Sequence, residues 1–359
     1  MTAIISFISA SQLGQERLDK DFASTIVDLF YRQHFASTTP VIKSLGSCGG
    51  FSGARFWRIE DASHVWCLRR WPQAACEDEN RLLWIHRQLA LAHAKGCSFL
   101  PVPLFSNTRE TLVEYGDHLW QMERWMPGTA DYHRLPSQAR LAAAMKTLAT
   151  FHRALQTDSQ RCQPSPGIQQ RLKRLSELHD GRAPTDGFYR LKSATEAGHA
   201  APEFRSLAAH LIFRFLGLAG QLHQRLLKAS QVSVPIQTVI ADIWHDHVLF
   251  SGDEVSGFVD FGAMRMDTMA CDIARLLGSL VPDQPAEWKW GLDAWCSKNQ
   301  LSPAEHDLIA LFDDSTIVLS GLNWLQWICV ENRQFGDLKP ITKRLRTISL
   351  RMDFMASKM

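Results

Sequence analysis

The stretch that most constrains how this chain can fold runs from Val239 to Gly262 and reads VIADIWHDHVLFSGDEVSGFVDFG. It predicts three short β segments, which are Val239–Ala241, Val248–Phe250 and Val255–Asp260. The Gly252-Asp253 turn joins apolar, β-branched runs and therefore indicates a hairpin. Two carboxylates, Asp242 and Asp260, stand at the ends of neighbouring strands. In phosphoryl transfer one carboxylate orients the attacking hydroxyl and another holds the metal ion on the phosphates, so the stretch favours that chemistry.

The order of residues in this stretch resembles the catalytic and metal-binding loops of the aminoglycoside phosphotransferase/choline kinase-like family. The usual pattern of that family is H-G-D-x-x-x-x-N followed by D-F-G. Here Asp242 is followed five residues later by His247 and then by Asp260-Phe261-Gly262. The spacing fits, although Ile240 and Ala241 replace His and Gly, and His247 replaces the metal-binding Asn. The resemblance implies an α+β, protein-kinase-like bilobal fold with a small antiparallel β-sheet N-lobe and a larger, mostly helical C-lobe.

The pattern along the chain, together with this resemblance, predicts three regions. Residues 1–40 form an N-terminal helical extension, residues 41–124 a nucleotide-binding N-lobe, and residues 125–359 a C-lobe for catalysis and acceptor binding. Within the first region, residues 11–35 carry apolar positions near the 3.6-residue period. We therefore expect a leading helix that packs on the first lobe.

A glycine- and serine-rich loop, Gly46–Gly53, separates the first two expected strands of the N-lobe. Glycine lets backbone N–H groups approach phosphates closely, because it adds no side chain and accepts positive φ. A long hairpin loop without a ligand has the same composition. The resemblance assigns Gly49, Gly50 and Ser52 to the nucleotide site.

The third expected strand, VWCLRRW, ends in Arg69 and Arg70 and leads into a helix that contains Glu79. In the resembled family, a basic residue on this strand contacts the α- and β-phosphates and pairs with a glutamate on that helix. The match falls on Arg69 and Glu79, and the alternative is an ordinary surface ion pair. Neighbouring strand residues point to opposite faces, so we expect Arg70 to face solvent.

The segment MERWMPG, from Met122 to Gly128, resembles the family's hinge between lobes. Backbone groups there hydrogen-bond the adenine edge, and the resemblance gives Met122 the task of covering the ring. Glu123 and Trp125 are the candidates for the backbone contacts.

Four residues of the C-lobe complete the expected site. His152 ends a helix, and we expect it to be a hydrogen-bonded structural residue. Asp272 matches a family aspartate that supports the catalytic loop, and its burial among apolar residues requires such partners. Trp324 and Trp327 either line an acceptor pocket or pack in the core.

These residues together predict a phosphotransferase with an alcohol group as acceptor, which moves the γ-phosphoryl group of ATP to a small hydroxylated metabolite or antibiotic. Asp242 orients the hydroxyl and Asp260 binds Mg²⁺. His247 leaves three alternatives: it binds Mn²⁺ better than Mg²⁺, Asp246 takes over its role, or the second metal position is lost, because Mg²⁺ prefers oxygen ligands.

Two other classes of function stay open. A nucleotide-binding pseudokinase or scaffold would explain the missing His-Gly and Asn, and a metal-dependent hydrolase would use the cluster of Asp242, His245, Asp246 and His247. The acceptor, the choice between ATP and GTP, and the oligomeric state also stay open.

The composition of the chain bears on its partners and its cellular environment. The net charge of +2 argues against a nucleic-acid partner, which would need a basic stripe. We find no run of about eighteen apolar residues and expect no membrane span. The eight cysteines contain no C-x-x-C pair, which favours free thiols in a reducing, cytoplasmic environment.

Overall fold

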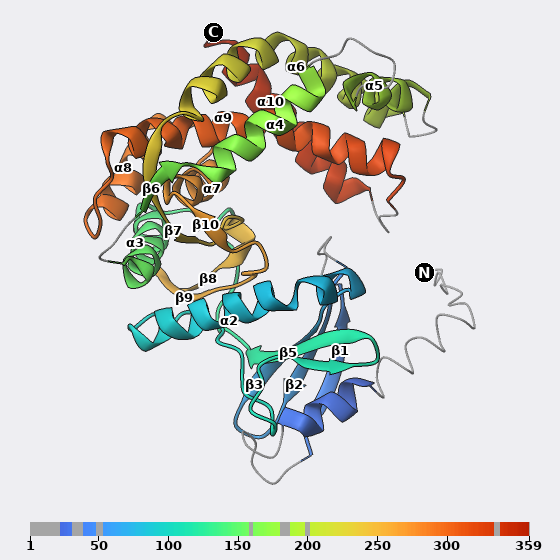
Figure 1. Ribbon diagram of the computed structural model, residues 1–359, viewed down its shortest axis with the longest axis vertical. Coiled ribbons are helices and arrows are strands. Elements are labelled where there is room, and N and C mark those ends of the chain that lie inside the picture. Colours follow the sequence, from blue (N-terminus) through green and yellow to red (C-terminus); the bar gives the residue numbers. More distant parts are fainter. Residues whose placement is uncertain are drawn as a thin grey trace. The chain divides into compact units, whose positions relative to one another are not determined.

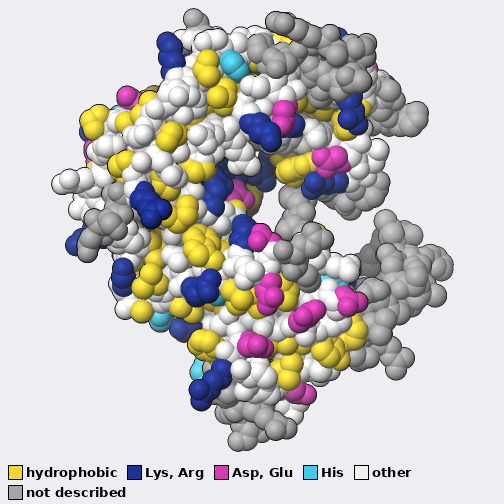
Figure 2. Space-filling model, in the orientation of Figure 1, with side chains coloured by type: hydrophobic (Ala, Val, Ile, Leu, Met, Phe, Trp, Pro, Cys, Tyr) yellow, Lys and Arg dark blue, Asp and Glu magenta, His cyan; other side chains and the backbone are white. Residues whose placement is uncertain are grey.

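The computed structural model describes residues 22–30, 39–47, 53–157, 161–179, 187–197, 202–333 and 338–358 of the 359-residue chain. The chain forms two compact units (Figure 1). Unit 1 contains residues 1–129, 249–251 and 256–262, and unit 2 contains residues 130–248, 252–255 and 263–359. Relative to the expected boundary after residue 124, unit 1 continues to Thr129 and includes two pieces of the hairpin that carries Asp260. Figure 2 shows charged side chains of both signs on the drawn face, with acidic ones gathered over unit 1.

Unit 1 is built on a five-stranded antiparallel sheet with the order β1-β2-β3-β5-β4, as expected for the N-lobe (Figure 1). Its strands are β1 (Val41–Gly46), β2 (Arg55–Glu60), β3 (Val65–Arg70), β4 (Val113–Tyr115) and β5 (His118–Arg124). A 3-10 helix, η1 (Gln73–Asp78), leads into the helix α2 (Glu79–Ala94).

One face of this sheet forms the core of unit 1. The helix of residues 22–30 buries Ile26 and Phe30 against Trp57, Trp120 and other apolar sheet residues, which confirms the expected leading helix for these residues. The rest of the expected range, 11–35, lies outside the described residues. Arg70 lies on this covered face, only 8% exposed, near the rings of Trp57 and Trp120. The expectation that Arg70 faces solvent is therefore wrong, because the leading helix covers the face that we took to be open.

Unit 2 is mostly helical and holds a small antiparallel sheet with the order β10-β7-β6. Its strands are β6 (Arg161–Pro164), β7 (Ser233–Val239) and β10 (Arg265–Asp267). Its helices are α3 (Gln138–Leu155), α4 (Pro166–His179), α5 (Gly187–Ala197), α6 (Pro202–Ala229), α7 (Ala270–Leu280), α8 (Pro285–Cys296), α9 (Pro303–Leu325) and α10 (Lys339–Ala356). Two short helical segments are η2 (His245–His247) and the π-helical η3 (Gln326–Val330).

The expected hairpin is present as β8 (Val248–Ser251) paired with β9 (Glu254–Phe258), but the strand before it differs from the prediction. We expected a strand over Val239–Ala241, whereas β7 ends at Val239. The sequence of β7 does not clearly predict a strand, because it contains Pro235 and proline is uncommon inside sheets. Ala241 has φ of 68°, which no strand residue adopts.

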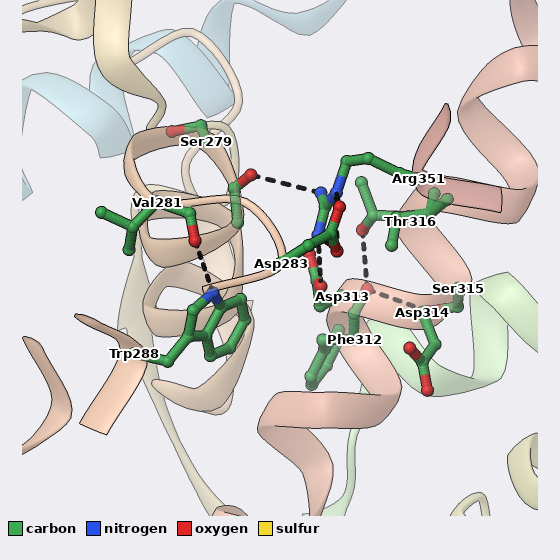
Figure 3. A network of polar contacts seen from close by, with 12 residues as sticks. Ser279, Val281, Asp283, Trp288, Phe312, Asp313, Asp314, Ser315, Thr316 and Arg351 are labelled. Atoms are coloured by element: carbon green, nitrogen blue, oxygen red, sulfur yellow. Dashed lines mark hydrogen bonds and ion pairs between the residues drawn. The ribbon is translucent and has the colours of Figure 1, made fainter. Parts of the chain in front are cut away.

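Arg351 on α10 ties three parts of unit 2 together (Figure 3). Its guanidinium donates to Asp313 Oδ2 of α9 at 2.7 Å, to both carboxylate oxygens of Asp283 at 3.3–3.4 Å, and to the Gly278 carbonyl oxygen of α7 at 3.2 Å. Burial raises the pKa of Asp313 to about 6, although Arg351 opposes that rise. This network connects α7, α9 and α10.

The segment Pro303–Val330 is long and apolar enough to cross a membrane by length and composition alone. Within the structure 67% of its apolar window is buried. The core helix of a globular unit has the same properties, so this segment is weak evidence for a membrane span.

Candidate active site

A buried aspartate holds the loop that follows β7. Asp272 of α7 is 0% exposed and accepts the backbone N–H of Ile240 at 2.7 Å on Oδ2 and that of Ala241 at 2.6 Å on Oδ1. His152 Nε2 donates to Asp272 Oδ2 at 3.0 Å. Three donors on one buried carboxylate satisfy its charge, which confirms the expected support of the loop by Asp272.

His152 is the structural histidine that the sequence predicts. It is fully buried, and Trp295 Nε1 of α8 donates to its Nδ1 at 3.2 Å. Because Nδ1 accepts a hydrogen bond, the ring proton is on Nε2, where it reaches Asp272. His152 therefore connects α3 and α8 to the loop.

Asp242 follows directly after the two anchored amides. Its side chain is 51% exposed, and Arg275 of α7 donates to its Oδ1 from Nε at 3.1 Å and from Nη2 at 2.9 Å. Ala241, at φ of 68°, occupies the left-handed region immediately before it. The carboxylate of Asp242 is thus accessible, and its charged partner Arg275 fixes its orientation.

His247 is not arranged as a metal ligand. Trp244 Nε1 donates to its Nε2 at 2.7 Å, and its Nδ1 therefore carries the proton that is donated to the Asp242 carbonyl oxygen at 2.9 Å. Both ring nitrogens are engaged in hydrogen bonds within the loop, and the sequence-based assignment of His247 to metal binding stays a prediction. The ring instead closes the loop from Asp242 to His247.

In unit 1, Asp260 pairs with Arg69. Arg69 Nη2 lies 3.2 Å from Asp260 Oδ1, and the Asp260 side chain is 49% exposed. Arg69 is 5% exposed, and its guanidinium packs on Trp71, with its centre 3.9 Å from the ring centroid. Its Nε is buried and has no hydrogen-bond partner among the described residues.

Glu79 does not pair with Arg69 among the described residues. It is exposed at the first residue of α2, while Arg69 contacts Asp260. His86, two helical turns later, faces Arg69 instead: both line one small cavity of about 10 Å³, with Gln121, Glu123 and Asp260. The sequence reasoning missed His86, although seven residues of spacing places it on the same helix face as Glu79.

The side chains of this small cavity form a polar chain. His86 Nε2 donates to Gln121 Oε1 at 3.1 Å, and Gln121 Nε2 donates to Glu123 Oε2 at 2.7 Å. Burial lowers the pKa of His86 to about 4 and raises the pKa of Glu123 to about 7. The positive charge of Arg69 opposes this increase in the pKa of Glu123, and the negative charge of Asp260 adds to it.

The hinge residues are placed differently from the prediction. Met122 is 0% exposed and packs in the core of unit 1, on the sheet face opposite to Gln121 and Glu123, so its side chain does not cover a ligand on their side. The backbone N–H of Trp125 donates to the Val65 carbonyl oxygen at 3.0 Å and is engaged within unit 1. Gly49, Gly50 and Ser52 lie outside the described residues.

Unit 1 therefore carries the Asp-Phe-Gly segment beside a five-stranded sheet, and unit 2 carries an anchored loop on which Asp242 is accessible. This combination defines a protein-kinase-like phosphotransferase. The chain belongs to the phosphotransferase enzyme family (APH), whose model matches residues 47–303. No curated protein matches the sequence.

Solved structures share the fold at low sequence identity. Spectinomycin phosphotransferase APH(9)-Ia, in complex with ADP and spectinomycin, has a TM-score of 0.62 at 12% identity over 99% of this chain and 100% of that chain. Amicoumacin kinase hAmiN, in complex with AMP-PNP, Ca²⁺ and Ami, has a TM-score of 0.59 at 15% identity over 95% and 96%. Choline kinase LicA from Streptococcus pneumoniae has a TM-score of 0.52 at 11% identity over 94% and 99%.

Proposed function

We propose that this chain transfers the γ-phosphoryl group of ATP to a hydroxyl group of a small molecule. The observation that supports this most directly is the loop held by Asp272, which fixes two backbone amides and leaves the next side chain, Asp242, accessible. A kinase-type transition state is loose, so its nucleophile needs placement more than a strong base. A half-exposed carboxylate on a rigid loop meets that need.

Asp242 accepts the hydrogen bond of the acceptor hydroxyl and aligns its oxygen, and Arg275 keeps the carboxylate in place. Arg69 contributes positive charge for the phosphates. The Nε atom of Arg69 is buried and has no partner among the described residues, so it can donate a hydrogen bond to an anion. Arg69 therefore fits the phosphates of a nucleotide.

Asp260 fits a hard divalent cation, because it offers a half-exposed carboxylate. His247 does not fit, since both of its ring nitrogens are engaged. Among the residues that the structure describes, no three His, Cys, Asp or Glu side chains gather as a metal site, so the hydrolase alternative gains no support. When bound, Mg²⁺ neutralises charge on the β- and γ-phosphates.

ADP release from ATP in the presence of hydroxylated acceptors tests the proposal. We expect Asp242→Asn and Asp260→Asn each to lower kcat by at least about a hundredfold. Asp253→Asn, an exposed residue in the turn of the same hairpin, is the matched control and should keep full activity. Full turnover by the double variant Asp242→Asn/Asp260→Asn would refute the assignment.

A nucleotide-binding pseudokinase is the second candidate. The observation that favours it is the engagement of both ring nitrogens of His247, at the position where the family has a metal-binding Asn. It predicts that ATP raises the melting temperature without ADP release for any acceptor. Arg69→Gln should remove that thermal shift under either proposal, so the release of ADP distinguishes them.

A further inference from the structure

Unit 2 contains a cavity of about 510 Å³ beside the catalytic loop. Its walls come from α4 and α9, and Ala241, the residue before Asp242, lines it together with Arg265 of β10. Sites for small molecules usually measure about 300–1,000 Å³. A molecule in this cavity therefore lies next to the loop that carries Asp242, within one unit.

The charged residues that line this cavity are mostly cations. Arg171, Lys173 and Arg174 come from α4 and Arg265 from β10, whereas Glu177 is the one acid among the described lining residues. Such a wall attracts negative charge and repels positive charge, and the partial enclosure by protein strengthens both effects.

Two of these cations have acidic partners. Arg265 lies 3.2 Å from Asp267 Oδ2, and Arg174 Nη1 lies 3.5 Å from Glu177 Oε2. Arg174 Nε also donates to the neutral Asn323 Oδ1 at 3.3 Å. The charge of these two residues is thus largely balanced by the protein.

The other two cations lack a direct acidic partner in the part of the chain that the structure describes. Arg171 donates to the Gly167 carbonyl oxygen at 3.2 Å and to Thr316 Oγ1 at 3.3 Å, both neutral groups, and lies over the Phe312 ring. Lys173 is exposed at the cavity and makes no ion pair with a described residue. These two charges would be balanced by an anionic ligand.

The positive charge continues toward Asp242. Burial lowers the pKa of Arg171 to about 10, and Arg265 and Arg275 add to this shift by repulsion, while Asp267 opposes it. Arg344 of α10 lies over the Trp244 ring on the same loop and also interacts with Asp242 and Arg275. Arg275 and Arg344 therefore add positive charge at the loop to that of the arginines that line the cavity.

We infer that the acceptor is an anion, a hydroxylated molecule whose phosphate ester or carboxylate is bound by Arg171 and Lys173. This inference rests on the proposed function. The acceptor hydroxyl oxygen forms a bond to the γ-phosphorus of ATP while the bond from that phosphorus to the β,γ-bridging oxygen breaks and leaves ADP. The hydroxyl proton passes to Asp242, which releases it to water. A polycationic aminoglycoside is excluded by repulsion from the same wall.

A matched set of acceptors tests this inference. Glucose 6-phosphate and gluconate carry the anionic group, glucose is neutral, and glucosamine and kanamycin are cationic. At constant ionic strength we expect ADP release with the anionic members. For these, Lys173→Glu should raise KM about tenfold with kcat unchanged, because it removes binding common to ground and transition states. Lys146→Glu reverses the charge of an exposed residue on α3 outside the cavity, and it should change neither KM nor kcat.

A binding measurement separates this inference from the proposed function. Gluconate and inorganic phosphate should raise the melting temperature above a sodium chloride control of equal ionic strength. The shift should persist in Arg69→Gln, which alters the nucleotide site, and be lost in Lys173→Glu and Arg171→Gln.

Each outcome decides one statement. Anion-specific shifts without ADP release from any acceptor would support the anion site and refute the phosphotransferase. ADP release with cationic acceptors alone would support the phosphotransferase and overturn the anionic acceptor. The absence of any anion-specific shift, or its survival in both cavity variants, would also overturn it.

Discussion

Arg275 donates two hydrogen bonds to a single oxygen of Asp242, from Nε at 3.1 Å and from Nη2 at 2.9 Å. The other carboxylate oxygen of Asp242 is not a partner of Arg275, and the side chain is half-exposed. Arginine thus fixes the rotation of the carboxylate without covering it. In a phosphotransferase this would leave one oxygen for the acceptor hydroxyl.

The first prediction concerns this pair. Arg275→Gln should lower kcat about tenfold or more while KM for ATP stays unchanged, because a freely rotating carboxylate orients the nucleophile poorly. Arg275→Lys should recover only part of the loss, since one ammonium cannot reproduce the two-donor geometry. Steady-state kinetics with ATP as the varied substrate measures both effects. Equal activity of all three proteins would show that the pair has no role in turnover.

The second prediction concerns the anchor of the loop. Asp272→Asn replaces one carboxylate oxygen by a donor and leaves a backbone amide of Ile240 or Ala241 unpaired in the interior. We expect a loss of about 2–3 kcal/mol in the free energy of unfolding, the range for a buried group that loses its partner. Urea denaturation followed by circular dichroism measures it. Asp293→Asn, whose exposed side chain pairs with Lys289, is the control and should change stability by less than about 0.5 kcal/mol.

The third prediction concerns metal preference. Because His247 uses both nitrogens within the loop, His247→Asn should leave the ratio of activities with Mg²⁺ and Mn²⁺ unchanged. Asparagine is too short to keep both contacts, so stability should fall by about 1 kcal/mol. Metal titrations of both proteins provide the comparison. A shift from Mn²⁺ toward Mg²⁺ in the variant would mean that the histidine binds metal after rotation.

The fourth prediction concerns pH. The pKa of Glu123 rises from 4.5 to about 7 in the folded protein, first because of burial. A carboxyl with a raised folded pKa favours the folded state below its unfolded pKa, and this contribution is lost as pH rises through the folded pKa. Glu123→Gln should therefore remove part of the decrease in stability between about pH 4.5 and 7. Its stability relative to the native protein should be higher at pH 8 than at pH 4, which denaturation at the two values measures; an identical difference at both would contradict the shift.

Much of the fold follows from local patterns that the sequence displays. The Gly252-Asp253 turn between apolar runs predicted the hairpin, and the periodic apolar residues before residue 35 predicted the leading helix. Asp272 was identifiable because a carboxylate among apolar helix residues requires hydrogen-bond partners, and the two amides and His152 supply them.

The errors arise where a prediction needed a tertiary contact. Arg70 is buried because a helix from before the sheet covers its face, which no strand pattern reveals. The metal-binding role of His247, which stays a prediction, was assigned by its position in a motif, and a motif does not show that Trp244 Nε1 donates to its Nε2. Met122 is a different case, since the two-residue period of β5 already separates it from Gln121 and Glu123, and the pattern was available in the sequence.

Unit 1 is assembled from three separate stretches of chain, and the last of them carries Asp260. A truncation after residue 129 would therefore remove the Asp-Phe-Gly segment, and a fragment that begins there would contain it without its sheet. Separate expression of the two units thus requires grafting residues 249–262 onto the first through a designed linker. The chain passes from one unit to the other at several points. An insertion at one of these points keeps both units whole only if the chain is unbroken at the others. Gene fusions and split-protein designs must therefore preserve every one of these connections.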